Sequence, residues 1–540
     1  MNGLIGTARL TRLALRRDRI SLPLWVLGLA GFLAGTTALW VDQYRSYPDL
    51  IQDTQVAAAN TGIRMMGLAS GASIGAYAMV RDYLTIAVLA ALMSTFAVVR
   101  HTRQGEETGR AELIGAAVVG RHAGLAAALI VTVAADAVLA VAVALSMIAA
   151  GQPVAGSFTA GGAVAAVGVA FAGVAALTTQ LTSSTRGASG LAAAVLGVAF
   201  LTSGIGNVAG HVDPSGLWVE SAWPAWVSPI GWGQQMRPFG GDQWWPLGLA
   251  VALFLACTGA AALLAARRDF GRGMLPQRAG HARAGRVLRS PLGLAFRLQR
   301  GALIGWAVAM LGFGLVMGGL VGQVREATGA TRDWYSRTGG SDQILDAFRA
   351  SILQMAAMAA AIYAVQVLLR MGSEEADGPL EPVLATAVSR LRWAAGYAVT
   401  TLLGATALVL LFATGAGLAA GAVLGDPAGQ VRDLLVAGLV QLPAILVIGA
   451  VVIAAVGALP RFAGPVSWAL LMASILAGPM FGPSLNLPRW AQDLSPFTHV
   501  PKAPAVPVTA GPVLALIAVV AVLAVAGVVS LRRRNLALPA

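Results

Sequence analysis

The chain has little charge, one cysteine and one lysine, and each scarcity excludes a class of protein. Only 11% of its 540 residues are charged, whereas soluble domains carry about 25%. Hydrophobic residues make up 57% of the chain, and its mean hydropathy is +0.74. The composition therefore excludes an ordinary soluble domain and predicts an integral membrane protein.

The single cysteine, Cys257, lies in an apolar run. One cysteine cannot form a disulfide within the chain or a cysteine-based metal site. The five histidines are scattered without the spacing of metal ligands. We therefore expect no metal site.

The chain has one lysine, and its position excludes the P-loop that ATPases use to bind nucleotide. A Walker A loop needs Gly-Lys-Ser/Thr to hold the phosphates, and Lys502 is followed by Ala503. The chain is therefore not itself a P-loop ATPase.

Long apolar runs alternate with short polar segments along the chain. A helix needs about 20 apolar residues to cross ~30 Å of hydrocarbon, whereas β-barrel strands alternate over roughly ten. The runs predict an all-α integral membrane protein with about twelve transmembrane helices. These are expected near residues 20–41, 83–99, 123–149, 158–182, 188–210, 244–266, 302–323, 350–369, 394–424, 432–459, 464–486 and 511–531.

The basic residues indicate the orientation of these helices. With both termini inside, 26 of the 37 Lys and Arg residues fall on the inner side. Inner loops of membrane proteins are enriched in Lys and Arg. The sequence therefore predicts an N-in, C-in, multi-pass protein of the plasma membrane.

Two similar halves follow one another. The shared features are arginines and a tryptophan at the start and a Trp…Ser-Pro near the end. Leu13–Arg16, Arg19, Trp25 and Trp223…Ser228-Pro229 match Leu294–Arg297, Arg300, Trp306 and Trp490…Ser495-Pro496. The repeat predicts two parallel pseudo-symmetric six-helix halves, as in some transporters. We expect residues 1–270 to form the first, 271–300 a basic linker with an interfacial helix, and 301–540 the second.

An acidic, arginine-terminated segment recurs after the second predicted span of each half. A shift of 269 residues superposes GEETGRAELIGAAVVGR (105–121) on the second copy within 372–393. The aligned pairs are Glu106 with Glu375, Gly109 with Gly378, Glu112 with Glu381, and Arg121 with Arg390. Each copy predicts an acidic turn at a glycine able to take φ > 0. A short helix follows, whose first acids and final arginine suit its dipole.

The pattern E-x-x-G-x-x-E-x-x-x-A-x-x-V-x-R resembles the coupling-helix region of ABC-2 type exporter permeases. Ser495-Pro496-Phe497 before the last span is similar to a motif of the same permeases. With two fused six-span halves, nearly the whole chain resembles the actinobacterial tetronasin or polyketide-antibiotic resistance permeases. The first copy departs from the pattern in lacking counterparts of Pro379 and Pro382.

The resemblance implies a permease that moves hydrophobic or amphipathic compounds, such as antibiotics, out of the cell. Two copies of a separate ATPase subunit, with ATP and Mg, would dock on the two recurring segments. The apolar face of the second short helix, Leu380, Val383 and Leu384, would pack on that subunit. The chain itself would need no cofactor and catalyse no reaction. Its other partners would be membrane lipid and the transported small molecule, and no nucleic acid is expected.

A few polar residues inside predicted spans are candidates for the substrate path. Asp136 lies near the middle of the third span, where an acid costs roughly 2.5–3.5 kcal/mol on insertion scales; the aligned position in the second half is Ala405. Tyr363, Gln366 and Gln441 lie in the eighth and tenth spans. All four side chains either face a cavity or form hydrogen bonds between packed helices.

The sequence leaves other functions open. Two six-span halves and Asp136 would also suit a proton-coupled secondary drug transporter, although such carriers usually bury several ionisable groups. A membrane-embedded enzyme would need a cluster of acid–base or metal-binding residues, which the sequence does not display. The recurring segments could also be solvated loops without a partner, but their common register favours docking.

Overall fold

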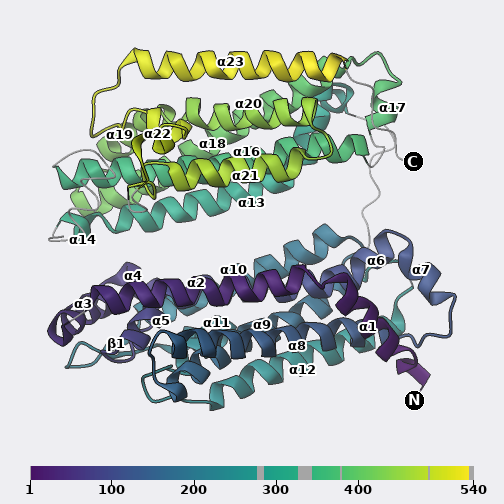
Figure 1. The fold of residues 1–540 in the computed structure, drawn as a ribbon, viewed down its shortest axis with the longest axis vertical. Coiled ribbons are helices and arrows are strands. Elements are labelled where there is room, and N and C mark those ends of the chain that lie inside the picture. Colours follow the sequence, from purple (N-terminus) through teal and green to yellow (C-terminus); the bar gives the residue numbers. More distant parts are fainter. Residues whose placement is uncertain are drawn as a thin grey trace. The chain divides into compact units, whose positions relative to one another are not determined.

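The computed structural model describes residues 2–44, 46–269, 271–275, 285–325, 343–376, 380–483 and 487–533. The chain divides into two compact units, Met1–Ala279 and Gly280–Ala540. Both are built from long helices (Figure 1). This is expected for apolar segments in lipid, because a helix satisfies its own backbone hydrogen bonds.

The first unit contains six long apolar helices: α2 (Ser21–Gln43), α5 (Ile74–His101), α8 (Ala123–Ala149), α9 (Val154–Leu181), α10 (Thr185–Val208) and α12 (Trp245–Arg267). The central helix is α9, which packs against α5, α8, α10 and α12. In its most apolar stretch 83% of the residues are buried. The core of this unit therefore surrounds α9.

The second unit contains α13 (Pro291–Gly319), α16 (Ile344–Ala376), α18 (Arg390–Leu424), α19 (Pro427–Leu439), α20 (Leu442–Ala458), α21 (Ala463–Ala477) and α23 (Ala510–Arg533). Helices α19 and α20 together form one span that is interrupted near Gln441. The most buried helix is α16, with 72% of its apolar stretch buried. It packs against α13, α18, α20 and α21.

Eleven helices in the described residues are long and apolar enough to cross a membrane. Eleven of the twelve predicted spans are thus confirmed as such helices. The remaining one, 464–486, is instead the 15-residue helix α21, about 22 Å long at ~1.5 Å per residue. It ends because Gly478 is extended (ψ 173°) before Pro479, and the residue before a proline disfavours the helical region.

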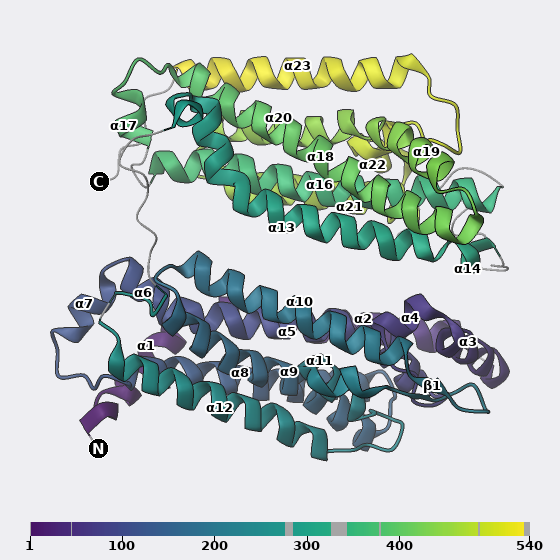
Figure 2. The same ribbon diagram turned by 180° about the vertical axis from the view of Figure 1, so that it is seen from behind.

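One end of each unit carries the recurring acidic segments. In the first unit this end holds η1 (Asn2–Leu4), α1 (Thr7–Arg17), α6 (Arg103–Glu107) and α7 (Arg110–Gly115). In the second unit it holds η3 (Arg286–Arg289) and α17 (Leu380–Leu384). Figures 1 and 2 show α7 and α17 at the ends of their own helix bundles. We call residues 102–122 the first loop and residues 380–390 the second loop.

The opposite end of the first unit is a small folded cap. It contains α3 (Tyr47–Ala59), α4 (Thr61–Met66), η2 (Trp223–Val227), α11 (Pro229–Gln235) and the antiparallel strands β1 (His211–Val212) and β2 (Val219–Glu220). The corresponding end of the second unit holds α14 (Val321–Arg325), α22 (Arg489–Gln492) and η4 (Pro496–His499). The segment between α10 and α12 therefore folds into short elements.

The two units begin differently. In the first, the amphipathic helix α1 ends at Arg17, and α2 starts at Ser21 after a break that contains Asp18. In the second, the corresponding amphipathic segment is continuous with its span, since α13 runs from Pro291 to Gly319. The interfacial segment expected in 271–300 is therefore joined to the first span of the second unit.

The orientation of the first unit can be tested by labelling. Leu113 in α7 is 79% exposed and Trp223 in η2 is 76% exposed, at opposite ends of the unit. Single cysteines would be introduced at these two positions after Cys257→Ser has removed the native thiol. In intact cells we expect a membrane-impermeant maleimide to label Trp223→Cys and not Leu113→Cys, and permeabilised cells to label both. Labelling of Leu113→Cys alone in intact cells would contradict the N-in topology.

Candidate functional site

The first loop presents an acid and two exposed apolar side chains. Its glycine, Gly109, has φ +71° and forms the turn between α6 and α7, as the sequence predicts. Glu112 on α7 is exposed, and Leu113 and Val118 are 79% and 86% exposed. This surface is available to a partner.

Glu106 is bound within the chain instead. Its carboxylate pairs with Arg103 at 2.7 Å and with Arg268 at 2.5 Å, and all three side chains are no more than 10% exposed. Arg103 also donates to the carbonyl of Thr179, and Arg268 donates to Gln180 Oε1 at 2.7 Å. These bonds attach α6 to the ends of α9 and α12.

The second loop presents its acid and turns its apolar side toward its own unit. Glu381 on α17 is exposed, whereas Leu380 is 3% exposed and packs into the core with partly buried Leu384. Glu375, at the end of α16, is buried. Gly378 lies outside the described residues. The exposed side of α17 is therefore its acidic side.

The arginine that ends each loop makes the same kind of contact in both units. Arg121 Nη1 donates to the carbonyl of Ala266 at 2.8 Å, near the end of α12. Arg390 Nη1 donates to the carbonyl of Leu531 at 3.4 Å, near the end of α23. Basic side chains commonly bind the free carbonyls at helix C-termini. Each loop is thus attached to the last helix of its unit.

An ion pair of the buried Asp18, not expected from the sequence, lies beside the first loop. Asp18, in the break between α1 and α2, accepts from Arg100 Nη1 at 2.6 Å and contacts His101 Nε2 at 2.6 Å. Burial alone would raise the pKa of Asp18, but the hydrogen bonds and charges of His101 and Arg100 outweigh it and lower that pKa below its usual value. The only signal in the sequence is an acid directly after a run of arginines.

The mid-span acid Asp136 is fully buried and lies against two other helices. Ser94 Oγ on α5 donates to its Oδ1 at 2.8 Å, with Oδ2 at 3.1 Å. On α9, a Cβ at Gly168 would lie 2.3 Å from the same Oδ1. The carboxyl group therefore fills the space where α5, α8 and α9 meet, and it joins packed helices there.

The other three candidates for the substrate path have different surroundings. Tyr363 and Gln441 are buried, and neither Tyr363 Oη nor Gln441 Oε1 has a hydrogen-bond partner among the described residues. Gln366 is exposed and accepts a bond from Trp306 Nε1 at 2.9 Å. Gln441 also lies at the interruption between α19 and α20. Asp136 belongs to the first unit, whereas these three residues belong to the second.

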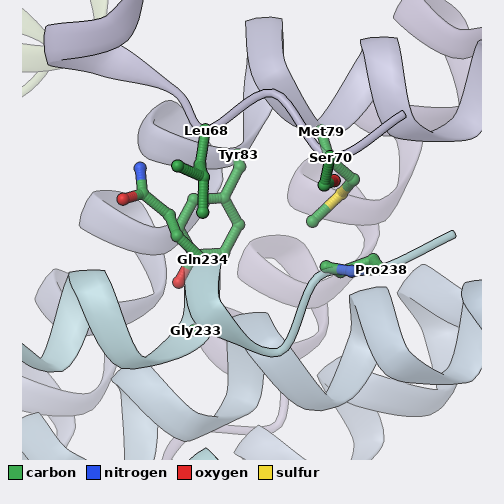
Figure 3. A pocket seen from close by; sticks show the side chains of 7 residues that line it. All are labelled: Leu68, Ser70, Met79, Tyr83, Gly233, Gln234 and Pro238. Carbon is green, nitrogen blue, oxygen red and sulfur yellow. The ribbon is translucent and has the colours of Figure 1, made fainter. Parts of the chain in front are cut away.

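A small cavity lies beneath the cap of the first unit (Figure 3). Two of its lining side chains, Tyr83 and Gln234, form hydrogen bonds within the chain. Tyr83 Oη donates to the carbonyl of Ile230 at 3.1 Å, and Gln234 Oε1 accepts from Ser203 and Asn207 at 2.8 and 2.9 Å. These bonds join the cap to α5 and α10, so we assign them a structural role. Across the ranges that the structure describes, no three His, Cys, Asp or Glu side chains are grouped to hold a metal ion.

Packing around Asp136 gives a stability prediction. Gly168→Ala places a methyl group against the carboxylate, and overpacking of this kind costs about 1–3 kcal/mol. We expect a lower midpoint of thermal unfolding in detergent, and a less than additive effect when Asp136→Ala provides the space. Gly124→Ala on α8 is the control, because a Cβ there meets nothing within 4 Å. Equal stability of the two alanine variants would show that Asp136 does not fill this interface.

Comparison with known proteins shows similarity along the whole chain. A family model described as the multidrug efflux system permease Rv1217c, C-terminal domain, matches residues 288–532. The multidrug efflux system permease protein Rv1217c of Mycobacterium tuberculosis (strain ATCC 25618 / H37Rv) is 38% identical over 544 residues, covering 99% of this chain and 96% of the relative. With eleven apolar helices of spanning length, these matches identify a multi-pass membrane protein. The chain belongs to the family of multidrug efflux system permeases.

Proposed function

We propose that this chain is the permease subunit of an ATP-driven ABC-2 type exporter. It would move hydrophobic or amphipathic compounds, including antibiotics, out of the cell. The observation that carries the proposal is full-length similarity to a protein named as a multidrug efflux permease. Energy would come from two copies of a separate ATPase subunit that binds ATP and Mg, because the chain has no Walker A lysine.

The two loops are the proposed docking sites for that subunit. Each includes a short helix between long helices: α7 between α5 and α8, and α17 between α16 and α18. Each presents an exposed acid, Glu112 or Glu381, and ends in an arginine attached to the last helix of its unit. Force applied to either short helix would therefore reach several spanning helices. Glu106 supports this arrangement from inside the unit, while Glu375 is buried beside the second loop.

The transported compound would contact both apolar surface and a few hydrogen-bonding groups. Gln441 is the best candidate, because its unpartnered Oε1 lies where a spanning helix is interrupted. Interrupted helices line the substrate sites of many transporters. Tyr363 supplies a second unpartnered polar group on α16. Asp136 is bonded to Ser94 within the packed bundle, so we assign it to packing.

Charge reversal tests the docking proposal. The double variant Glu112→Arg with Glu381→Arg changes only side chains that are exposed in the free permease. We expect its ATPase subunit to dissociate at least tenfold more readily, since losing one partner of a desolvated charge pair costs about 2–5 kcal/mol. The measurement is binding of the purified ATPase subunit to the permease in nanodiscs, with drug-stimulated hydrolysis as a second readout.

The matched control is Glu220→Arg with Asp433→Arg, which makes the same change in net charge at exposed positions away from the loops. We expect this control to bind the ATPase subunit normally. Unchanged binding by the loop variant would refute docking through these acids. Equal weakening by both variants would assign the effect to net charge and would equally refute it.

A further inference from the structure

Asp18 fixes the end of α5 that leads into the first loop. Its carboxylate is 1% exposed and binds Arg100 and His101, both in the last turn of α5. His101 is separated from Arg103, the first residue of α6, by Thr102 alone. The break between α1 and α2 is therefore tied to the start of the first loop by two bonds to one carboxylate. We call Asp18, Arg100 and His101 the hinge lock.

The repeat identifies the residues that occupy the same positions in the second unit. The register that matches Leu13–Arg16 with Leu294–Arg297 places Gln299 at the position of Asp18. The register of the loops places Arg370 at the position of His101. The second unit thus keeps a cation on the helix that leads into its loop, but has a neutral amide in place of the carboxylate.

The contacts in the second unit agree with this substitution. Gln299 is 3% exposed, and neither its Oε1 nor its Nε2 has a hydrogen-bond partner among the described residues. Arg370 Nη1 donates to the carbonyl of the adjacent Leu298 at 2.9 Å. Its charge is paired with Glu374, on its own helix, at 3.4 Å. The ion pair of Arg370 therefore lies within α16, and α16 is joined to α13 here by one hydrogen bond to a backbone carbonyl and not by an ion pair.

Two further anchors of the first loop have no charged counterpart in the second. Arg103, which binds Glu106 and the end of α9, aligns with Gly372. Glu107, which accepts from the backbone N–H of Thr185 at 3.0 Å, aligns with Ala376. At these two positions the first loop is held to its neighbours by hydrogen bonds of charged side chains with Thr179 and Thr185, whereas the second has small, uncharged residues there.

We propose that the two docking loops are mechanically unequal, with Asp18 as the positioning residue that immobilises the first. The first loop holds its ATPase subunit in a fixed position, and the second loop moves when nucleotide binds. This inference rests on the proposed function, because it assigns different roles to the two docking sites. It follows from the contrast between a charged hinge lock in one unit and Gln299 in the other.

The experiment measures the movement of each loop separately. In a Cys257→Ser background, a spin label is attached to Leu113→Cys in the first loop or Ala385→Cys in the second, both exposed positions. The permease is assembled with its ATPase subunit in nanodiscs, and label mobility is recorded without nucleotide and with ATP under non-hydrolysing conditions. We expect ATP to change the spectrum of the second-loop label several-fold more than that of the first.

Two substitutions then remove the carboxylate from the first unit and introduce one at the aligned position of the second unit. Asp18→Asn should make the first-loop label respond to ATP, and Asp18→Glu should largely restore the wild-type behaviour. Gln299→Asp places a carboxylate opposite Arg370 and should suppress the response of the second loop. It should also lower the amount of compound transported per ATP hydrolysed. Asp433→Asn, at an exposed position away from both loops, is the matched control and should change neither loop.

Equal responses of the two loops in the unaltered complex would overturn the inference and leave docking intact. The inference also fails if Gln299→Asp folds and its second loop still responds fully. If Asp18→Asn does not fold, the inference is still tested by comparing the two labelled loops with the hinge lock intact, because that comparison needs no substitution in the hinge lock. Failure of the ATPase subunit to bind the permease at all would instead contradict the proposed function.

Discussion

The bilayer interior offers no water to a buried polar group, and this constraint determines where every charge of the chain can lie. Backbone groups must bond within their own helix, so the apolar segments form helices of spanning length. Many ionisable side chains lie at helix ends, where they form ion pairs with one another. One acid, Asp136, is accommodated in the middle of α8 because Ser94 donates to it and Gly168 leaves it room.

The charges gathered at the helix ends also determine how the units can transmit force. Arginine pairs hold α6 to the ends of α9 and α12, and the hinge lock holds the start of α2 to the end of α5. A buried ion pair is a poor source of stability, because the desolvation of both partners offsets much of their attraction. Its value here is geometric: it fixes the first loop in position relative to the long helices of its unit.

Hydrophobic runs predicted almost all of the helical framework, because the length that a bilayer demands is a local property of the sequence. Local pattern also predicted the positive φ at Gly109 and the short helices α7 and α17. It failed at α21, where Gly478 and Pro479 end the helix within an otherwise apolar run.

The pairing of charges could not be predicted in the same way. Glu106 reaches Arg268 across 162 positions, and Asp18 reaches Arg100 across 82. Such partners are set by how the helices pack, and neither residue type nor spacing reveals them. The sequence could not predict that Leu380 packs into its own unit. Helix α17 has only five residues, and its apolar side could equally have packed on a partner. The sequence therefore suggested a candidate site, and tertiary packing decided which of its acids are exposed.

The source of energy is the central claim, and reconstituted transport tests it most directly. Proteoliposomes would contain the permease alone or with its ATPase subunit, and uptake of a fluorescent hydrophobic drug would be followed with ATP or with an imposed proton gradient. We expect ATP-dependent transport only when both proteins are present, and no loss of transport when a protonophore collapses the gradient. Transport by the permease alone, driven by the proton gradient and abolished by the protonophore, would contradict an ATP-driven mechanism.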